Sequence, residues 1–165
     1  MQEYISEFYS HYGKFVVTFH VLGAMIWVGG MVAFLAAVFP SMKQIKNEKI
    51  MVLRTLDMLS NYFLLILPFV FLMIATALIM NIAIGFDNGH PAMSTIVNTK
   101  EALWFFMFLI YIYTYYKKRE TKKMFLDGDE TMAVDSIKLI INYFFPISIF
   151  LGIIAIYLGL ILRGM

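Results

Sequence analysis

The amino-acid sequence predicts an all-α integral membrane protein, an up-and-down bundle of four transmembrane helices with both termini outside. Two observations predict this class. Of the 165 residues, 61% are hydrophobic and only 15% are charged, against about 45–50% and about 25% in an average soluble domain. The apolar residues also gather in four stretches, each near the roughly 20 residues that cross about 30 Å of hydrocarbon as a helix.

The four predicted spans are Phe15 to Phe39, Tyr62 to Ile84, about Val97 to Tyr116, and Leu139 to Leu162. None alternates polar and apolar residues like a barrel strand, so each is expected to be a helix. The first is expected to be retained, because its apolar run exceeds the roughly 7–15 residues of a signal-peptide core. We expect one domain over residues 1–165, with polar connections of up to about twenty residues.

Basic residues are concentrated in two of the connections between spans. The first holds Lys43, Lys46, Lys49 and Arg54, and the second holds Lys117, Lys118, Arg119, Lys122, Lys123 and Lys138. These are ten of the thirteen lysines and arginines. The positive-inside rule therefore places both connections in the cytoplasm and both termini outside, as expected for a multi-pass protein of a bacterial-type inner membrane. We interpret the basic runs as topology signals and expect no nucleic-acid partner.

His20 is the unusual residue of the first span. Together with Gly23, Trp27, Gly30 and Phe34 it falls on one face of a helix. Ionisable residues inside a membrane are costly and usually functional, and a neutral imidazole can ligate haem iron, copper or zinc. The two glycines predict either close helix packing or a slot for a planar ring beside the histidine. The alternative for His20 is a hydrogen bond to a neighbouring helix.

Lys100 opens the third span, where the positive end of the helix dipole disfavours a cation. An anionic group is therefore expected to hold it, such as a haem propionate, Glu101 or a lipid phosphate. Simple snorkelling of the lysine to the interface is the alternative.

The connection between the second and third spans combines turn residues with the pair His90 and Met93. Imidazole and thioether form a donor set that suits copper, and the same pair can ligate haem. The candidate metal ligands are therefore His20, His90 and Met93, all on the outer side of the predicted topology.

Several classes of chemistry are excluded or disfavoured. The chain has no cysteine, which excludes disulfides, thiolate metal sites and covalently attached c-type haem. It contains no nucleotide-binding loop and no hydrolase motif. Carboxylates are almost absent from the spans, which argues against a carboxylate-driven proton pump.

The pattern His20-x6-Trp27-Val28-Gly29-Gly30, with Lys100 opening a third span that ends in Tyr116-Lys117-Lys118-Arg119, resembles two related groups of membrane domains. These are the copper-resistance protein D (CopD) family and HemJ, the protoporphyrinogen oxidase. In the HemJ-like branch, the resemblance implies b-type haem bound through His20, with Lys100 needed for activity. In the copper branch, it implies copper uptake or delivery. The run Met31 to Ala37 lacks the Leu-Pro-Arg stretch of HemJ proteins, and Trp-Val-Gly-Gly looks more like the copper branch.

The leading hypothesis is a membrane protein that binds b-type haem, or copper, at its outer half, with a redox or electron-transfer role of the CopD/HemJ-like kind. His20, Gly23, Trp27, Gly30 and Lys100 would form the cofactor site. If the protein is an enzyme, it would be a haem-dependent membrane oxidoreductase. The alternatives are a copper transport or delivery protein without redox chemistry, and a structural accessory subunit of a larger complex. The expected partners are the lipid bilayer and a homodimer or larger membrane complex.

Overall fold

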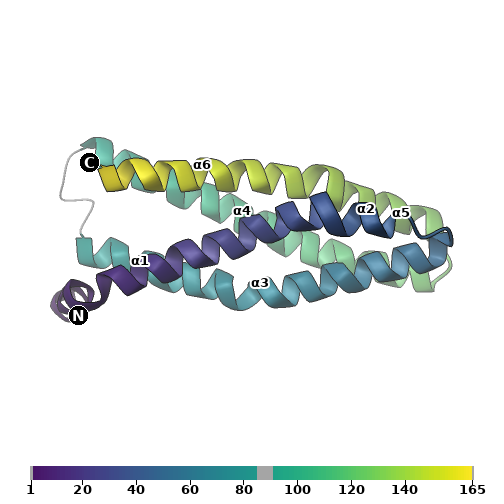
Figure 1. The fold of residues 1–165 in the computed structure, drawn as a ribbon, viewed down its shortest axis with the longest axis horizontal. Coiled ribbons are helices and arrows are strands. Elements are labelled where there is room, and N and C mark those ends of the chain that lie inside the picture. Colours follow the sequence, from purple (N-terminus) through teal and green to yellow (C-terminus); the bar gives the residue numbers. More distant parts are fainter. Residues whose placement is uncertain (1, 85–90, 165) are drawn as a thin grey trace.

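The computed structural model describes residues 2–84 and 91–164, and nearly all of them are helical. In chain order, the elements are α1 (Gln2–Ala33), the π-helical turn η1 (Phe34–Val38), α2 (Phe39–Met42), α3 (Glu48–Ile84), α4 (Pro91–Leu126), α5 (Glu130–Leu139), the π-helical turn η3 (Ile140–Phe144) and α6 (Phe145–Gly164). Because α1, η1 and α2 run on continuously, as do α5, η3 and α6, the elements form four long rods (Figure 1).

The four rods lie side by side and alternate in direction. Figure 1 shows the N-terminus and the C-terminus at the same end of the bundle, with the α2–α3 and α4–α5 connections at the other end. α1 packs chiefly along α3, while α4 packs along α5 and α6. Each rod is long and apolar enough to cross a membrane. The predicted all-α four-helix membrane bundle is therefore confirmed.

The helices extend well beyond the predicted spans at the end opposite the termini, which we call the basic end because it carries the two basic segments. α3 has 37 residues and is about 55 Å long, well beyond about 30 Å of hydrocarbon. The polar connections predicted here are reduced to residues 43–47 and 127–129. The Asn47 side chain accepts a hydrogen bond from the Ile50 N–H (3.1 Å), and Asp129 accepts one from the Met132 N–H (3.4 Å). These caps start the next helices within a few residues.

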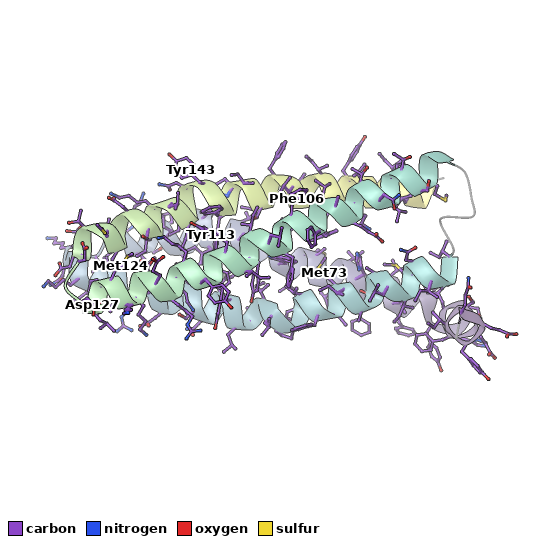
Figure 2. All side chains as sticks on the ribbon, turned by 180° about the vertical axis from the view of Figure 1, so that it is seen from behind. Met73, Phe106, Tyr113, Met124, Asp127 and Tyr143 are labelled. Atoms are coloured by element: carbon purple, nitrogen blue, oxygen red, sulfur yellow. The ribbon has the colours of Figure 1, made fainter. Side chains whose placement is uncertain are left out.

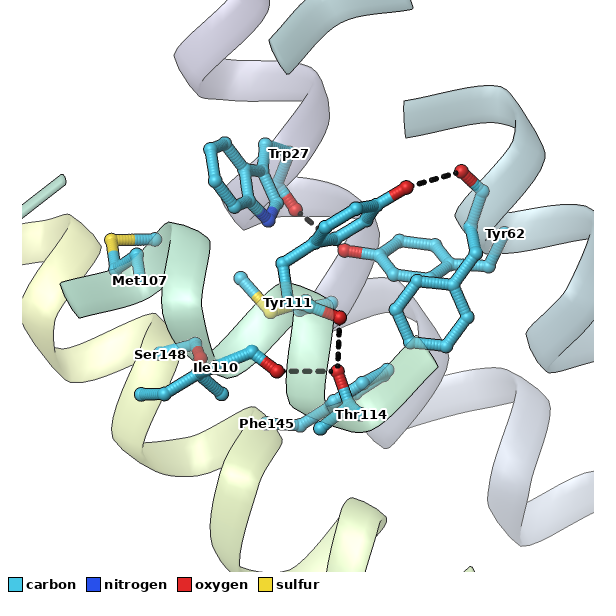
Figure 3. Close-up of a pocket in the computed structure, with 10 residues that line it drawn as sticks. Trp27, Tyr62, Met107, Ile110, Tyr111, Thr114, Phe145 and Ser148 are labelled. Carbon is cyan, nitrogen blue, oxygen red and sulfur yellow. Dashed lines mark hydrogen bonds between the residues drawn. The ribbon is translucent and has the colours of Figure 1, made fainter. Parts of the chain in front are cut away.

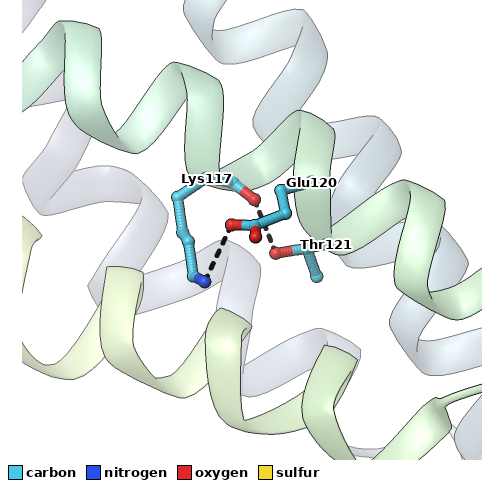
Figure 4. A network of polar contacts seen from close by, with 3 residues as sticks. All are labelled: Lys117, Glu120 and Thr121. Carbon is cyan, nitrogen blue, oxygen red and sulfur yellow. Dashed lines mark hydrogen bonds and ion pairs between the residues drawn. The ribbon is translucent and has the colours of Figure 1, made fainter.

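Polar side chains also bond within and between the helices of the basic end. Lys117 Nζ lies 2.9 Å from Glu120 Oε2, and the Thr121 hydroxyl donates to the Lys117 carbonyl over 2.7 Å (Figure 4). Lys49 of α3 pairs with Glu130 of α5 at 2.6 Å. Such surface pairs contribute little energy each, so the good helix propensity of Lys, Glu and Arg remains the main reason why these segments are helical.

Both π-helical turns precede a Phe-Pro pair, Phe39-Pro40 and Phe145-Pro146. In each case the phenylalanine N–H bonds the carbonyl five residues earlier, that of Phe34 or Ile140. A proline lacks the N–H for the usual bond, and its ring would clash with the carbonyl four residues earlier. The wide turn relieves that clash. Proline alone does not produce a π-helical turn, since Pro68 lies inside α3, where no such turn forms.

An aromatic cluster beside the two π-helical turns joins rods of the bundle. The Phe145 ring lies 5.5 Å from both Phe34 and Tyr62, and the last two are 6.2 Å apart. The Tyr62 hydroxyl, although buried, donates to the Trp27 carbonyl over 3.1 Å. Aromatic rings whose polar ends find backbone acceptors can stabilise a core without a desolvation penalty.

The outward faces of the helices are apolar along most of their length. Figure 2 shows side chains projecting outward along the helices. Leu64 and Phe150 have 72% and 65% of their surface exposed, and Phe106 has 58%. Large exposed apolar surfaces are rare on soluble monomers. A lipid bilayer is the environment that suits these helices.

Candidate functional site

His20 lies inside the bundle, on the face of α1 that meets α3. Its side chain is only 7% exposed, and Nδ1 lies 3.0 Å from the Thr76 hydroxyl of α3. Thr76 directs its single proton to the backbone carbonyl of Leu72 (2.7 Å) or Met73 (3.0 Å). Since that proton is already used, Thr76 accepts from the Nδ1–H of a neutral imidazole. We therefore infer the tautomer in which Nε2 keeps a free lone pair.

Lys100 reaches the same region of the bundle from α4. The next residue, Glu101, bonds Asn81 of α3, which follows the His20 partner Thr76 by five residues, about 8 Å along the helix. Lys100 Nζ lies against α6, where a Cβ added to Gly159 would be only 3.3 Å away. Glu101 instead accepts a hydrogen bond from Asn81 over 3.0 Å. Within residues 2–84 and 91–164, no carboxylate lies within salt-bridge distance of Lys100.

The glycine notches on the histidine face of α1 are filled by side chains of α3. A Cβ added to Gly23 would lie 2.6 Å from Met73 Cγ and 3.2 Å from the Phe69 carbonyl oxygen. A Cβ added to Gly30 would lie 2.9 Å from the Tyr62 ring. The sequence allowed either close helix packing or a slot for a planar ring at these glycines. At both positions the structure shows close packing, and α3 leaves no slot for a ring there.

Trp27 is also buried on this face, and it contacts a second tryptophan, Trp104, which no motif in the sequence singled out. Its ring lies 5.4 Å from that of Trp104 and meets the edge of Tyr111 at 6.0 Å. Trp104 Nε1 is buried, and no residue in the described ranges accepts its proton. Trp104 follows Lys100 by four residues, so both occupy one face of α4. That spacing was the available signal. It places in neighbouring turns two donors for which the described residues supply no salt bridge, in the case of Lys100, or no hydrogen-bond acceptor, in the case of Trp104.

The predicted pair His90 and Met93 is not joined to His20 by anything that the structure describes. His90 lies outside the described residues. Met93 precedes Lys100 by seven residues, which is about 10 Å along the helix axis toward the chain termini. Across the described parts of the chain, no three His, Cys, Asp or Glu residues gather closely enough to hold a metal ion.

A small cavity lies deeper in the bundle, between Trp27 and the aromatic cluster (Figure 3). Its volume is about 10 Å³, which is roughly the minimum for one water molecule. Ser148 of α6 and Thr114 of α4 lie in its wall, and the Thr114 hydroxyl donates to the Ile110 carbonyl of its own helix over 2.8 Å. The cavity could hold a water molecule beside Ser148, but it is far too small for a porphyrin.

These features define a class, a multi-pass four-helix membrane protein with a buried histidine and a lysine in one half of the bundle. Comparison with protein-family models, with curated proteins and with solved structures finds no match to the chain. The functional assignment therefore depends on the geometry of the site.

Proposed function

We propose that the protein binds b-type haem, with copper as the alternative, through Nε2 of His20, and that it has a redox or electron-transfer role. The observation that supports the proposal most directly is the hydrogen bond between His20 Nδ1 and Thr76. Histidines that ligate metals almost always donate their second ring N–H to a protein acceptor, which fixes the tautomer and the orientation of the ring. A bound haem would supply one-electron redox chemistry.

Two further groups fit the polar edge of such a cofactor. Lys100 has a charge without a described carboxylate within salt-bridge distance, so it could pair with a propionate. Trp104 has a buried N–H that lacks an acceptor among the described residues. Side chains of α3 fill the space beside Gly23 and Gly30. These glycines would therefore let α1, the helix that carries His20, pack closely on α3, and the haem ring would not lie between α1 and α3.

The same geometry favours a second candidate, a structural accessory subunit. A buried imidazole that donates to a threonine on the next helix already has the partner that the structural alternative requires. In that case His20 would join α1 to α3 and bind no cofactor.

The first test is the visible absorption spectrum of the purified protein, oxidised and then reduced with dithionite. We expect a Soret band that sharpens on reduction, disappears in His20→Ala and persists in His11→Ala. His11 is the matched control because it is exposed and its Nδ1 contacts only neighbouring residues of its own helix. A featureless spectrum after haem supplementation would refute haem binding. Metal analysis of both variants would then distinguish copper bound through His20 from a structural subunit.

We also propose that the basic end lies in the cytoplasm and both termini lie outside, because positive residues favour the cytoplasmic side. The absence of cysteine allows single-cysteine labelling without background. Asp127→Cys reports on the connection after α4, and Glu3→Cys on the N-terminus. A membrane-impermeant maleimide added to intact cells should label only Glu3→Cys, while permeabilisation should expose Asp127→Cys. Labelling of Asp127→Cys in intact cells, with Glu3→Cys labelled only after permeabilisation, would show the opposite topology.

A further inference from the structure

A cavity lies at the basic end, far from His20, between α2, α3 and α5. Its volume is about 140 Å³, roughly ten times the minimum for one water molecule. Five apolar side chains form most of its wall, and three polar side chains complete it. The apolar residues are Phe39, Met51, Val52, Val134 and Ile137, and the polar ones are Lys43, Lys138 and Asn142.

The polar side chains of this basic pocket carry positive charge and hydrogen-bond donors. Lys43 lies just after α2, with Nζ 4.6 Å above the centre of the Phe39 ring. Lys138 lies on α5, where it contacts Asp135 of its own helix at 3.3 Å. Both partners of that contact are well exposed, so the pair is weak and leaves the ammonium available to another anion. A phosphate group between these lysines would accept charge-assisted hydrogen bonds.

The composition of the wall distinguishes a lipid head group from a free phosphate ion. A dissolved ion gains nothing from the apolar residues, whereas the glycerol and first methylenes of a lipid would cover them. Phe39 ends the first predicted span and Asn142 lies near the start of the fourth, so the pocket adjoins the predicted membrane boundary of these two rods. Basic pockets between helices at this level of a membrane suit anionic lipid head groups.

From this combination we propose that the basic pocket binds the phosphate head group of an anionic phospholipid. Lys43 and Lys138 contact the phosphate from two sides, Asn142 donates to it, and the wall around Phe39 covers the apolar base of the lipid. The proposal is independent of any cofactor at His20.

The test is the thermal stability of the full-length protein in a neutral detergent. The protein is mixed with phosphatidylcholine alone or with phosphatidylcholine plus phosphatidylglycerol. We expect phosphatidylglycerol to raise the melting temperature of the wild type, and the double variant Lys43→Gln/Lys138→Gln to lose most of that increase. The matched control is Lys46→Gln/Lys123→Gln, which removes the same charge from exposed positions of the basic end and should keep the increase.

A second variant tests the apolar wall without changing the charge. Val134→Trp fills the cavity while both lysines remain, and it should also lose most of the phosphatidylglycerol effect. Equal losses in the two lysine double variants would overturn the proposal, because they would show general electrostatic attraction. An equal increase with inorganic phosphate in place of the lipid would also overturn it, since the pocket would then bind a free ion.

Discussion

Gly152→Leu is expected to lower the free energy of unfolding by about 3 kcal/mol, at the upper end of what overpacking costs. Gly152 lies on α6 at its contact with α1 and α4. An added Cβ would lie 2.5 Å from Val28 Cγ2 and 3.2 Å from Met107 Cε. A methionine can move its terminal methyl group, but a β-branched valine has one strongly preferred rotamer in a helix. The helices must therefore separate, and thermal or denaturant unfolding in detergent would measure the loss.

The same substitution at Gly29 is the control. Gly29 is exposed on α1, and an added Cβ would have no atom within 4 Å. Gly29→Leu therefore gains the same helix propensity and the same side chain without a clash, and its stability should equal or exceed that of the wild type. Similar losses in both variants would mean that Gly152 is not a point of close approach between α6 and α1.

Thr76→Val is expected to cost about 1 kcal/mol of stability and, where a cofactor is bound through His20, to change its spectrum or reduction potential. The substitution nearly preserves the shape of the side chain but removes the acceptor 3.0 Å from His20 Nδ1. The magnitude reflects hydrogen bonds between membrane helices, which average well below 2 kcal/mol. The imidazole would also lose the interaction that orients it.

Thr114→Val is the matched control for this substitution. Thr114 is as buried as Thr76, but its hydroxyl bonds only to carbonyls of its own helix. If the bond between α1 and α3 is what matters, Thr114→Val should have the smaller effect on stability and none on the orientation of His20. Equal losses would contradict a specific role for Thr76.

The four long apolar helices could be predicted, because a hydrophobic run of about twenty residues indicates each one. The helical extensions at the basic end could not, because polar residues suit both a loop and the exposed face of a helix. There the decisive features were local. Asn47 and Asp129 restart the helices, and residues with good helix propensity fill the segments between them.

The candidate site was predictable only in part. His20 and Lys100 stood out because ionisable residues are rare inside membranes, and contacts to Thr76 and Asn81 of α3 place His20 and the residue after Lys100 at a similar level of the bundle. Thr76 gave no such signal, because a threonine in an apolar helix normally satisfies its hydroxyl on its own backbone. The role of Gly23 was ambiguous for a different reason: the sequence does not say which side chain of another helix fills a notch, and here it is Met73.

Each π-helical turn inserts one extra residue into its rod relative to a regular helix. One residue corresponds to about 100° of rotation, given 3.6 residues per turn. The faces on either side of η1, and likewise of η3, are therefore out of phase. The stripe that begins at His20 does not continue in α2 in the same register, and Lys43 faces a direction that a regular helix would not give it. In these two rods, the two halves can thus present different surfaces to their neighbours. Packing within the membrane determines one surface, and the charged end of the bundle determines the other.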